Sequence, residues 1–455
     1  MDDRARALAV AHDRATAFLE RLPERPVWPR ASYDDMLEAL GGDLPSEGTD
    51  PAELVEQLAV QAEPGLAGIP GGRFYGFVIG GGLPAALAAD WLASTWDQNA
   101  GLSAISPAAS AVETIAGGWL VDLLGLPAQS AVGFVTGATM ANFTGLAVAR
   151  REVLAKAGWD LDQQGLPGAP PTRIVVGEHR HSTVDRAAKF LGFGRNQLIV
   201  VPADGEGRML PDELARALED AGDGPLVVCL QAGEVHTGAF DLFEPLIGLA
   251  HDHGAWVHVD GAFGLWAATA ESTRHLTEGV QSADSWATDG HKTLNVPYDS
   301  GMAIVRDGAA MRAVFGSRAD YLIEGAGDPS ERTPELSRRA RGFAVWAALR
   351  SLGRDGVAAL VRRLCDNAAR MAAGLADIPG VEVLNDVVFT QVVATFGSDD
   401  ETRALGQRLL ADGTAVLTPG EWRGRVVQRC SISNWSTTYD DVDMTLAAVR
   451  RLLAE

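Results

Sequence analysis

Short apolar runs alternate with helical segments through the middle of this 455-residue chain, and this alternation limits its fold more than any other feature. Four runs that we expect to be strands are rich in aliphatic and β-branched residues: 173–177, 198–201, 225–230 and 255–260. Residues 211–218 and 241–250 have helical periodicity. Strands that alternate with helices of about ten residues form parallel sheets covered on both faces. The sequence therefore predicts an α/β fold with a mainly parallel central sheet.

Two of the expected strands end beside ionisable groups. The run at 255–260 ends on Asp260, and the next run, 282–290, leads into Lys292. Ligands of open α/β sheets bind beyond the carboxyl ends of the strands, so we expect these two side chains to face one molecule. A lysine in a partly dry cleft forms Schiff bases, and a carboxylate can pair with the ring nitrogen of pyridoxal phosphate (PLP). Taken alone, the pair is read more simply as a solvated lysine and a strand-capping acid.

The sequence around both residues resembles a known family. HVDGAFG at 258–264 and ATDGHKTLNVPYDSG at 287–301 are similar to motifs of the PLP-dependent group II amino-acid decarboxylases, which include aromatic-L-amino-acid and glutamate decarboxylases. The resemblance extends from about Phe74 to the C-terminus. It implies the fold type I of PLP-dependent transferases and PLP as cofactor. It also implies a role for each residue of the motifs: Lys292 carries PLP as an aldimine, Asp260 pairs with the pyridine nitrogen, Ala262 packs under the ring, and His291 contacts the cofactor.

Residues 132–154 have the pattern of an anion site. An expected strand breaks at Gly137, and a helix rich in alanine and leucine follows. Free N–H groups and the positive end of the helix dipole meet at such a turn. It is not a Walker loop, because the Gly-Lys-Ser/Thr of that motif is missing. The resemblance implies that Gly137, Ala138 and Thr139 bind the cofactor phosphate.

His181 follows the expected strand at 173–177 and precedes a helix. An isolated histidine there would cap the helix or form a local hydrogen bond. The His-Ser-Thr sequence matches the family's histidine that stacks on the pyridine ring, so the resemblance favours His181 over His179 for this role. Stacking would hold the ring coplanar with its imine.

Aromatic residues Phe74 and Tyr75 lie in the glycine-rich segment 71–77, which suits a binding loop and an ordinary packed turn equally well. The resemblance favours a substrate-binding role, because the family has an aromatic patch here. Arg429 matches a family arginine near the ligand carboxylate, although strand-end arginines more often form structural pairs. Arg73 in the same loop would suit an acidic or polar substrate.

The glycine-rich, charged segment 317–332 has the composition of a mobile lid. In decarboxylases of the family a lid tyrosine returns a proton to the carbanion, and Tyr321 is the nearest match by position. A packed loop tyrosine is an equally good interpretation of this residue.

The chain departs from the family at two places. Relatives often have threonines where Glu234 and Val235 stand, so Thr237 would have to supply a hydroxyl, and Glu234 or His236 would contact the substrate instead. Asp289 stands where some relatives carry an amide near the phosphate. A carboxylate beside a phosphate is repulsive, so we expect Asp289 to turn away or to pair with another residue.

Composition excludes several classes of partner. Lys plus Arg number 38 against 60 Asp plus Glu, and the net charge of −22 argues against nucleic acid and anionic membranes. The N-terminus lacks a secretory pattern, and Asp90 interrupts the apolar run at 83–95, which is too short for a membrane span. The cysteines show no metal-ligand spacing and are expected to be buried free thiols: Cys229, Cys365 and Cys430. We therefore expect a soluble, cytoplasmic protein without a metal site.

Three regions are expected along the chain. Residues 1–95 form a helical N-terminal segment that, by the resemblance, packs across a homodimer interface. Residues 96–335 form the large PLP-binding α/β domain, and residues 336–455 form a small C-terminal α/β domain, with strands expected at 388–396 and 426–433.

The resemblance implies a carboxy-lyase that decarboxylates an L-amino acid, preferably an aromatic one, to an amine and carbon dioxide. Other PLP chemistry on the same scaffold stays open: aminotransfer, or oxidative decarboxylation that forms an aldehyde. A non-catalytic relative used as an interaction module is a further alternative, against which the joint presence of Lys292, Asp260 and His181 argues.

Overall fold

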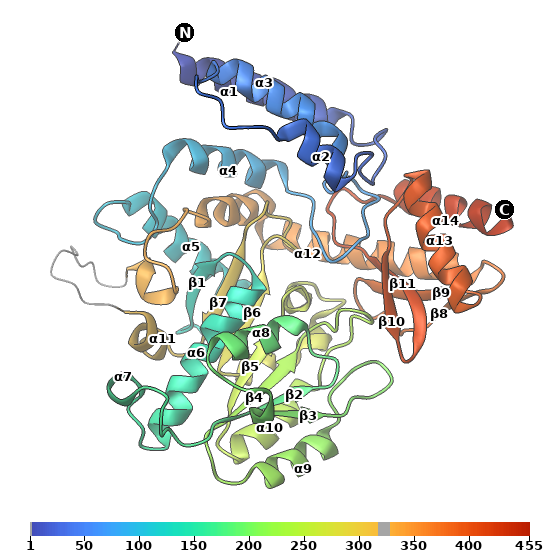
Figure 1. Ribbon diagram of the computed structural model, residues 1–455. Helices are drawn as coiled ribbons and strands as arrows, with labels where there is room; N and C mark the ends of the chain where they lie inside the picture. The colour runs from blue at the N-terminus through green and yellow to red at the C-terminus, as the bar shows by residue number, and fades with distance from the viewer. Residues whose placement is uncertain (1, 317–327) are drawn as a thin grey trace.

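A computed structural model of the protein describes residues 2–316 and 328–455 (Figure 1). Its larger sheet has seven strands in the order β1-β7-β6-β5-β4-β2-β3. All neighbouring pairs are parallel except those of β7, which runs antiparallel to β1 and β6. The strands are β1 (Ala131–Val135), β2 (Arg173–Gly177), β3 (Leu198–Val201), β4 (Leu226–Gln231), β5 (Trp256–Asp260), β6 (Ser285–Asp289) and β7 (Gly301–Val305). The mainly parallel sheet expected from the sequence is confirmed.

Helices cover both faces of this sheet. Helices α5 (Pro107–Leu123), α9 (Pro211–Ala221) and α10 (Phe243–Asp252) pack with the start of α12 (Gly342–Ala376) against one face. The other face carries α6 (Ala138–Lys156), α8 (Ser182–Phe190) and α11 (Gly308–Phe315). Successive side chains of β2 show why: Ile174 and Val176 join the core under α6 and α8, whereas Val175 joins the opposite one. A strand buried on both faces is apolar at every position, as the sequence pattern required.

A second sheet lies in the C-terminal part of the chain and has the strand order β10-β11-β9-β8, antiparallel throughout. Its strands are β8 (Val381–Val383), β9 (Gln391–Phe396), β10 (Thr418–Trp422) and β11 (Arg425–Ser431), and its helices are α12 (Gly342–Ala376), α13 (Asp399–Asp412) and α14 (Tyr439–Ala454). Sequence patterns predicted β9 and β11 but missed β8 and β10. Helix α12 breaks at Gly353, where φ is 62°.

The N-terminal helices are α1 (Asp3–Glu20), α2 (Tyr33–Leu40), α3 (Pro51–Ala62) and α4 (Pro84–Trp96). Helices α1 and α3 lie side by side above α4, at the edge of the molecule (Figure 1). Neither α1, α2 nor α3 contains a buried residue. Their apolar side chains therefore have too little of this chain to pack against.

The remaining helical segments are short. One α-helical turn, α7, spans Leu161–Gln164, and the 3-10 segments are Glu63–Gly65, Arg195–Gln197, Gly264–Thr269, Arg274–Thr277, Val280–Ser282 and Pro329–Arg332. Three of these 3-10 segments lie between β5 and β6. In the two described ranges, no helix combines the length and the apolar character that crossing a membrane requires.

Candidate active site

A cavity of about 450 Å³ opens where β2, β4, β5 and β6 end. It brings together five of the residues expected at the site: His181, Asp260, Ala262, Lys292 and Arg429. They come from four separate segments of the chain, so only the folded chain assembles them. The cavity lies beyond the carboxyl ends of parallel strands, where α/β proteins bind ligands.

Asp260, the last residue of β5, is 5% exposed and is held by hydrogen bonds. Its Oδ2 accepts from Asn142 Nδ2 at 3.0 Å, and its Oδ1 accepts from the Ala262 N–H at 3.2 Å. Asn142 Oδ1 in turn lies 2.9 Å from His258 Nε2, and His258 Nδ1 lies 2.8 Å from Ser285 Oγ. Burial lowers the pKa of His258 to about 3, so this imidazole is neutral and donates from Nε2. The chain of bonds fixes the carboxylate of Asp260 at the cavity wall.

Asn142 and His258 were not singled out from the sequence. Asn142 lies on α6, 118 residues before Asp260, and nothing in its local pattern shows that it reaches the end of β5. The one signal was an amide in an otherwise small and apolar helix turn. Both side chains are completely buried.

Lys292 follows β6 and pairs with Asp289 rather than with Asp260: its Nζ is 2.8 Å from Asp289 Oδ2. Asp289 Oδ1 accepts the N–H of Ala138 at 2.6 Å. The expectation that Asp289 pairs with another residue is therefore met twice, by the lysine and by the first residue of α6.

At the turn that leads into α6, the backbone of β7 packs closely against Gly137. Gly137 precedes the helix, and a Cβ added to Gly301 on β7 would lie only 2.4 Å from the Cα of Gly137. Ala138 is buried, and Thr139 lies half-buried on the first turn. Nearby on the loop, Ser300 is 1% exposed, and its Oγ has no hydrogen-bond partner among the described residues. A helix N-terminus beside a lysine and an unpartnered buried hydroxyl fits a phosphate group.

His181 caps α8: its Nδ1 accepts the N–H of Thr183 at 3.3 Å and lies 2.9 Å from that residue's hydroxyl. It also lines the cavity, so capping the helix does not remove the side chain from the site. His291 is buried and stacks on Tyr298, with ring centroids 4.2 Å apart. Burial lowers the pKa of His291, which favours a neutral ring.

Phe74 and Tyr75 do not reach the cavity. Phe74 packs with Val27 and Val416, and Tyr75 is buried in the core of the C-terminal sheet. The residue of this segment that lines the cavity beside Val78 and Ile79 is Phe77.

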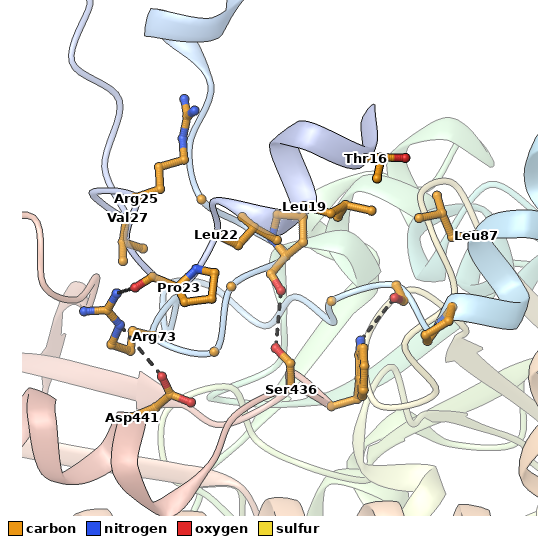
Figure 2. Close-up of a pocket in the computed structure, with 18 of the residues that line it drawn as sticks. Thr16, Leu19, Leu22, Pro23, Arg25, Val27, Arg73, Leu87, Ser436 and Asp441 are labelled. Atoms are coloured by element: carbon orange, nitrogen blue, oxygen red, sulfur yellow. Dashed lines mark hydrogen bonds and ion pairs between the residues drawn. The ribbon is translucent and has the colours of Figure 1, made fainter. Parts of the chain in front are cut away.

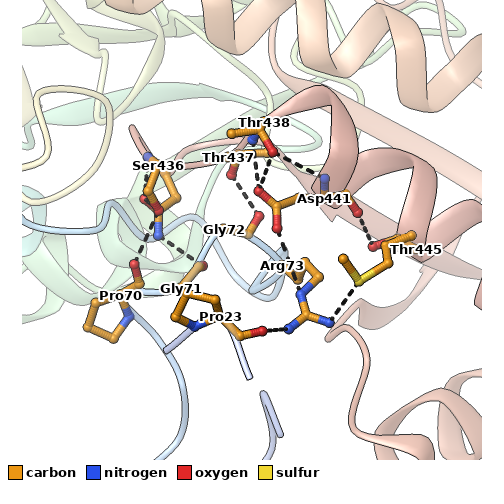
Figure 3. A network of polar contacts seen from close by, with 12 residues as sticks. Pro23, Pro70, Gly71, Gly72, Arg73, Ser436, Thr437, Thr438, Asp441 and Thr445 are labelled. Carbon is orange, nitrogen blue, oxygen red and sulfur yellow. Dashed lines mark hydrogen bonds and ion pairs between the residues drawn. The ribbon is translucent and has the colours of Figure 1, made fainter. Parts of the chain in front are cut away.

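The glycine-rich loop before these aromatics is tied to the C-terminal segment (Figure 3). Arg73 donates to Pro23 O at 2.7 Å and lies 3.8 Å from Asp441, while Thr437 and Asn434 donate to the carbonyls of Gly72 and Gly71. Arg73 is thereby committed to a structural pair and does not line the cavity with Lys292.

Glu234 closes a turn instead of facing the ligand space. Its carboxylate is 1% exposed and accepts the N–H groups of His236 at 2.6 Å and Thr237 at 2.7 Å. His236 bonds Glu234 through Nδ1 at 2.9 Å and stacks on Trp422. The turn presents Gly233 and Val235 to the cavity, which leaves Glu234 and His236 outside its lining.

Arg429 on β11 is a buried cation at the cavity wall, 7% exposed. Its Nη2 donates to Phe77 O at 3.3 Å, whereas its Nε has no hydrogen-bond partner among the described residues. Burial lowers the pKa of Arg429 to about 10, and the charge of Glu234 opposes this shift. A buried guanidinium with an unused donor fits a carboxylate ligand. Tyr321 lies outside the described residues.

A larger cavity, of about 670 Å³, lies elsewhere, between α1, α4 and the segment before α14 (Figure 2). Leu19, Leu22, Leu87 and Trp91 give it an apolar wall, and it contains neither Lys292 nor Asp260. Its walls come from α1, α4 and the loops beside them, which sets it apart from the strand-end site.

Comparisons with known proteins agree with this geometry. The model described as "Pyridoxal-dependent decarboxylase conserved domain" matches residues 36–396. The chain is 28% identical to an aromatic-L-amino-acid decarboxylase of Bacillus atrophaeus, over 98% of this chain and 94% of that one. It is 30% identical to an L-2,4-diaminobutyrate decarboxylase of Rhizobium meliloti (strain 1021), over 80% and 74%. A human cysteine sulfinic acid decarboxylase is 25% identical, over 92% and 89%.

Solved structures share the fold. The crystal structure of Oryza sativa TDC with PLP and tryptamine has a TM-score of 0.93 at 23% identity, covering 100% of this chain and 98% of that one. The structure of mouse CSAD has a TM-score of 0.90 at 22% identity, with the same coverage. The expected fold type I is confirmed.

Proposed function

This chain belongs to the pyridoxal-dependent decarboxylase family, and on that premise we propose that it removes the α-carboxyl group of an aromatic L-amino acid, giving the amine and carbon dioxide. It is a PLP-dependent carboxy-lyase. The observation that carries the proposal is one cavity that holds Lys292, Asp260 and Arg429 within an apolar and aromatic wall.

We propose that Lys292 holds the cofactor covalently and that Asp260 keeps a proton on its ring nitrogen. Bound PLP supplies an electron sink for the pair of electrons left by a departing carboxylate. Asn142 and the Ala262 N–H fix the two oxygens of Asp260, so the carboxylate needs no reorganisation to hold that proton. His181 is proposed to stack on the ring, and Gly137, Ala138 and Thr139 to hold the phosphate, with Ser300 as a further donor.

The substrate preference rests on the cavity wall. Its apolar members are Phe77, Val78, Ile79, Val235, Phe263 and Tyr298. Arg429 is the proposed partner of the substrate α-carboxylate, because its unused Nε would otherwise stay buried without an acceptor. Holding the carboxylate in one orientation selects the bond that breaks. The aromatic-L-amino-acid decarboxylase among the relatives supports the same substrate class.

Three further proposals concern parts not seen directly in the cavity. Tyr321 is our proposed proton donor to the α-carbon, on its place in the sequence alone. A homodimer is proposed because α1, α2 and α3 bury no residue in this chain. A cytoplasmic location is proposed because Cys229, Cys365 and Cys430 are free thiols, as expected in a reducing compartment.

The test is a panel of L-amino acids incubated with the PLP-loaded protein, with carbon dioxide and amine measured together. We expect aromatic amino acids to react fastest, and Phe77→Ala to lower kcat/KM for them more than for alanine. Steady transamination that requires a 2-oxo acid and releases no carbon dioxide would defeat the proposal, and oxygen consumption with aldehyde formation would assign the oxidative reaction instead.

A further inference from the structure

Asp289 occupies the position in which the phosphate of the cofactor is expected. Its side chain is 2% exposed, with one oxygen 2.6 Å from the Ala138 N–H and the other 2.8 Å from Lys292 Nζ. The carboxylate thus uses the first N–H of α6 and the ammonium of the lysine at the same time. These are the two kinds of donor that an incoming phosphate would seek.

The charges around Asp289 are already balanced. In the part of the chain that the structure describes, the basic groups within 4 Å of its carboxylate are Lys292 and His291. Burial lowers the pKa of His291, which favours its neutral form. One lysine therefore faces one carboxylate. A phosphate that arrives here adds negative charge to a site with no surplus of positive charge, and the burial of Asp289 reduces screening by water.

We propose that Asp289 is an internal anion that competes with the cofactor phosphate for the N-terminus of α6 and that holds the Lys292 ammonium in place when the cofactor is absent. Cofactor uptake then requires that Asp289 give up its hydrogen bond from the Ala138 N–H. The chain therefore binds PLP less tightly than the same site would without the Asp289 carboxylate. The inference rests on the proposed phosphate role of Gly137, Ala138 and Thr139.

The prediction is specific to the phosphate. Neutralising Asp289 removes the competing charge but leaves Asp260, Asn142 and Arg429 unchanged. PLP is expected to gain more affinity than pyridoxal, which lacks the phosphate and gains only from the Lys292 amine that Asp289 no longer holds as an ammonium. Asp289→Asn also supplies an amide N–H group, from which a phosphate oxygen can accept a hydrogen bond.

The experiment compares the wild type with D289N by titrating apoprotein at pH 8 with PLP and, separately, with pyridoxal, following tryptophan fluorescence. We expect D289N to bind PLP at least about tenfold more tightly, as removal of one close charge repulsion implies, and to gain clearly less affinity for pyridoxal. Inorganic phosphate should also inhibit PLP binding to D289N at a lower concentration. D289S is the second variant, in case D289N folds poorly, and must shift the affinity in the same direction.

The control is Asp299→Asn, which removes an equal charge from the loop that follows β6, at a carboxylate paired with Arg341. It should leave the affinity for PLP unchanged. Equal or weaker binding of PLP by both Asp289 variants would overturn the inference, and so would an equal gain for pyridoxal. If the wild type binds no PLP at all, the proposed function is overturned as well. If the wild type binds PLP tightly and the variants bind it no better, only the proposed competition between Asp289 and the phosphate is overturned.

Discussion

At the scale of single residues, Asp260 owes its position to side chains from other elements. Asn142 from α6 binds its Oδ2, and His258 from the middle of β5 binds Asn142 in turn. Each of these groups is buried, so a substitution that removes one hydrogen-bonding side chain leaves another polar group without a hydrogen bond. The site therefore depends on residues that do not line the cavity themselves.

Asn142→Leu tests this dependence. The change leaves an oxygen of Asp260 and the Nε2 of His258 without their partner, so we expect a loss of about 1–3 kcal/mol in the free energy of unfolding and weaker PLP binding. Urea unfolding and a PLP titration measure the two effects. Asn367→Leu is the matched control: Asn367 is equally buried but bonds the Thr437 carbonyl in the C-terminal part, so it should lower stability without changing PLP binding.

His258 makes stability depend on pH. Its native pKa, about 3, lies below the ordinary value, so between pH 6.5 and 3 the unfolded chain binds a proton that the native chain does not. Stability must then fall as the pH falls, by about 2 kcal/mol between pH 7.5 and 5.0 from this group. We expect His258→Gln to lose less stability over this range than the wild type, and His253→Gln, at an exposed site, to behave like the wild type. Equal losses in all three proteins would contradict this account.

The sequence predicts some of these residues and not others, for a physical reason. Lys292, Asp260 and His181 follow strands, and the carboxyl ends of neighbouring parallel strands meet wherever the sheet forms. Asn142 and Asp289 act through contacts between α6 and segments more than a hundred residues away, which no local pattern contains. Phe74 and Tyr75 were favoured over Phe77 because a loop pattern does not show which aromatic side chain turns inward.

At the scale of elements, prediction succeeded where a segment buries an apolar pattern. Most strands of the large sheet are mainly apolar runs, such as β4, whereas β10 contains Pro419 and Gly420, and β8 has only three residues. Such segments become strands because β9 and β11 offer them a paired edge. Local propensity does not carry that information.

Gly353 divides α12 into two halves, and a substitution there tests whether its backbone conformation requires glycine. At φ of 62° an L-residue is strained, while a Cβ added there meets nothing within 4 Å, so the effect is one of backbone alone. We expect Gly353→Ala to lower stability by about 1 kcal/mol and to leave PLP binding unchanged. Gly248→Ala in α10, where a Cβ is equally free, should be neutral or stabilising. Thermal unfolding of the two variants measures the difference, and equal midpoints would contradict the assignment.

At the scale of the whole molecule, the N-terminal helices lack a covering surface. Leu54 and Leu58 on α3 are 52% and 55% exposed, and Leu58 lines a further cavity together with Phe18 of α1. Apolar faces of this kind are usual at subunit interfaces. The proposed homodimer would cover them.

Light scattering after size-exclusion chromatography tests the homodimer. We expect a mass of about twice the 48.0 kDa of one chain and a shift towards the monomer for the double variant Leu54→Glu, Leu58→Glu. Leu242→Glu, at a comparably exposed residue before α10, is the control and should keep the mass of the wild type. A wild type that is monomeric at every concentration would be inconsistent with the proposal.

The most direct test of the whole account uses the scarcity of lysine in this chain. There are three lysines, Lys156, Lys189 and Lys292, and only the last lines the cavity. PLP-saturated protein is reduced with borohydride and digested, and the phosphopyridoxyl label is located by mass spectrometry. We predict that the label lies on Lys292 and is lost in Lys292→Ala. A label on Lys156 or Lys189 in place of Lys292, or no label, would contradict the account.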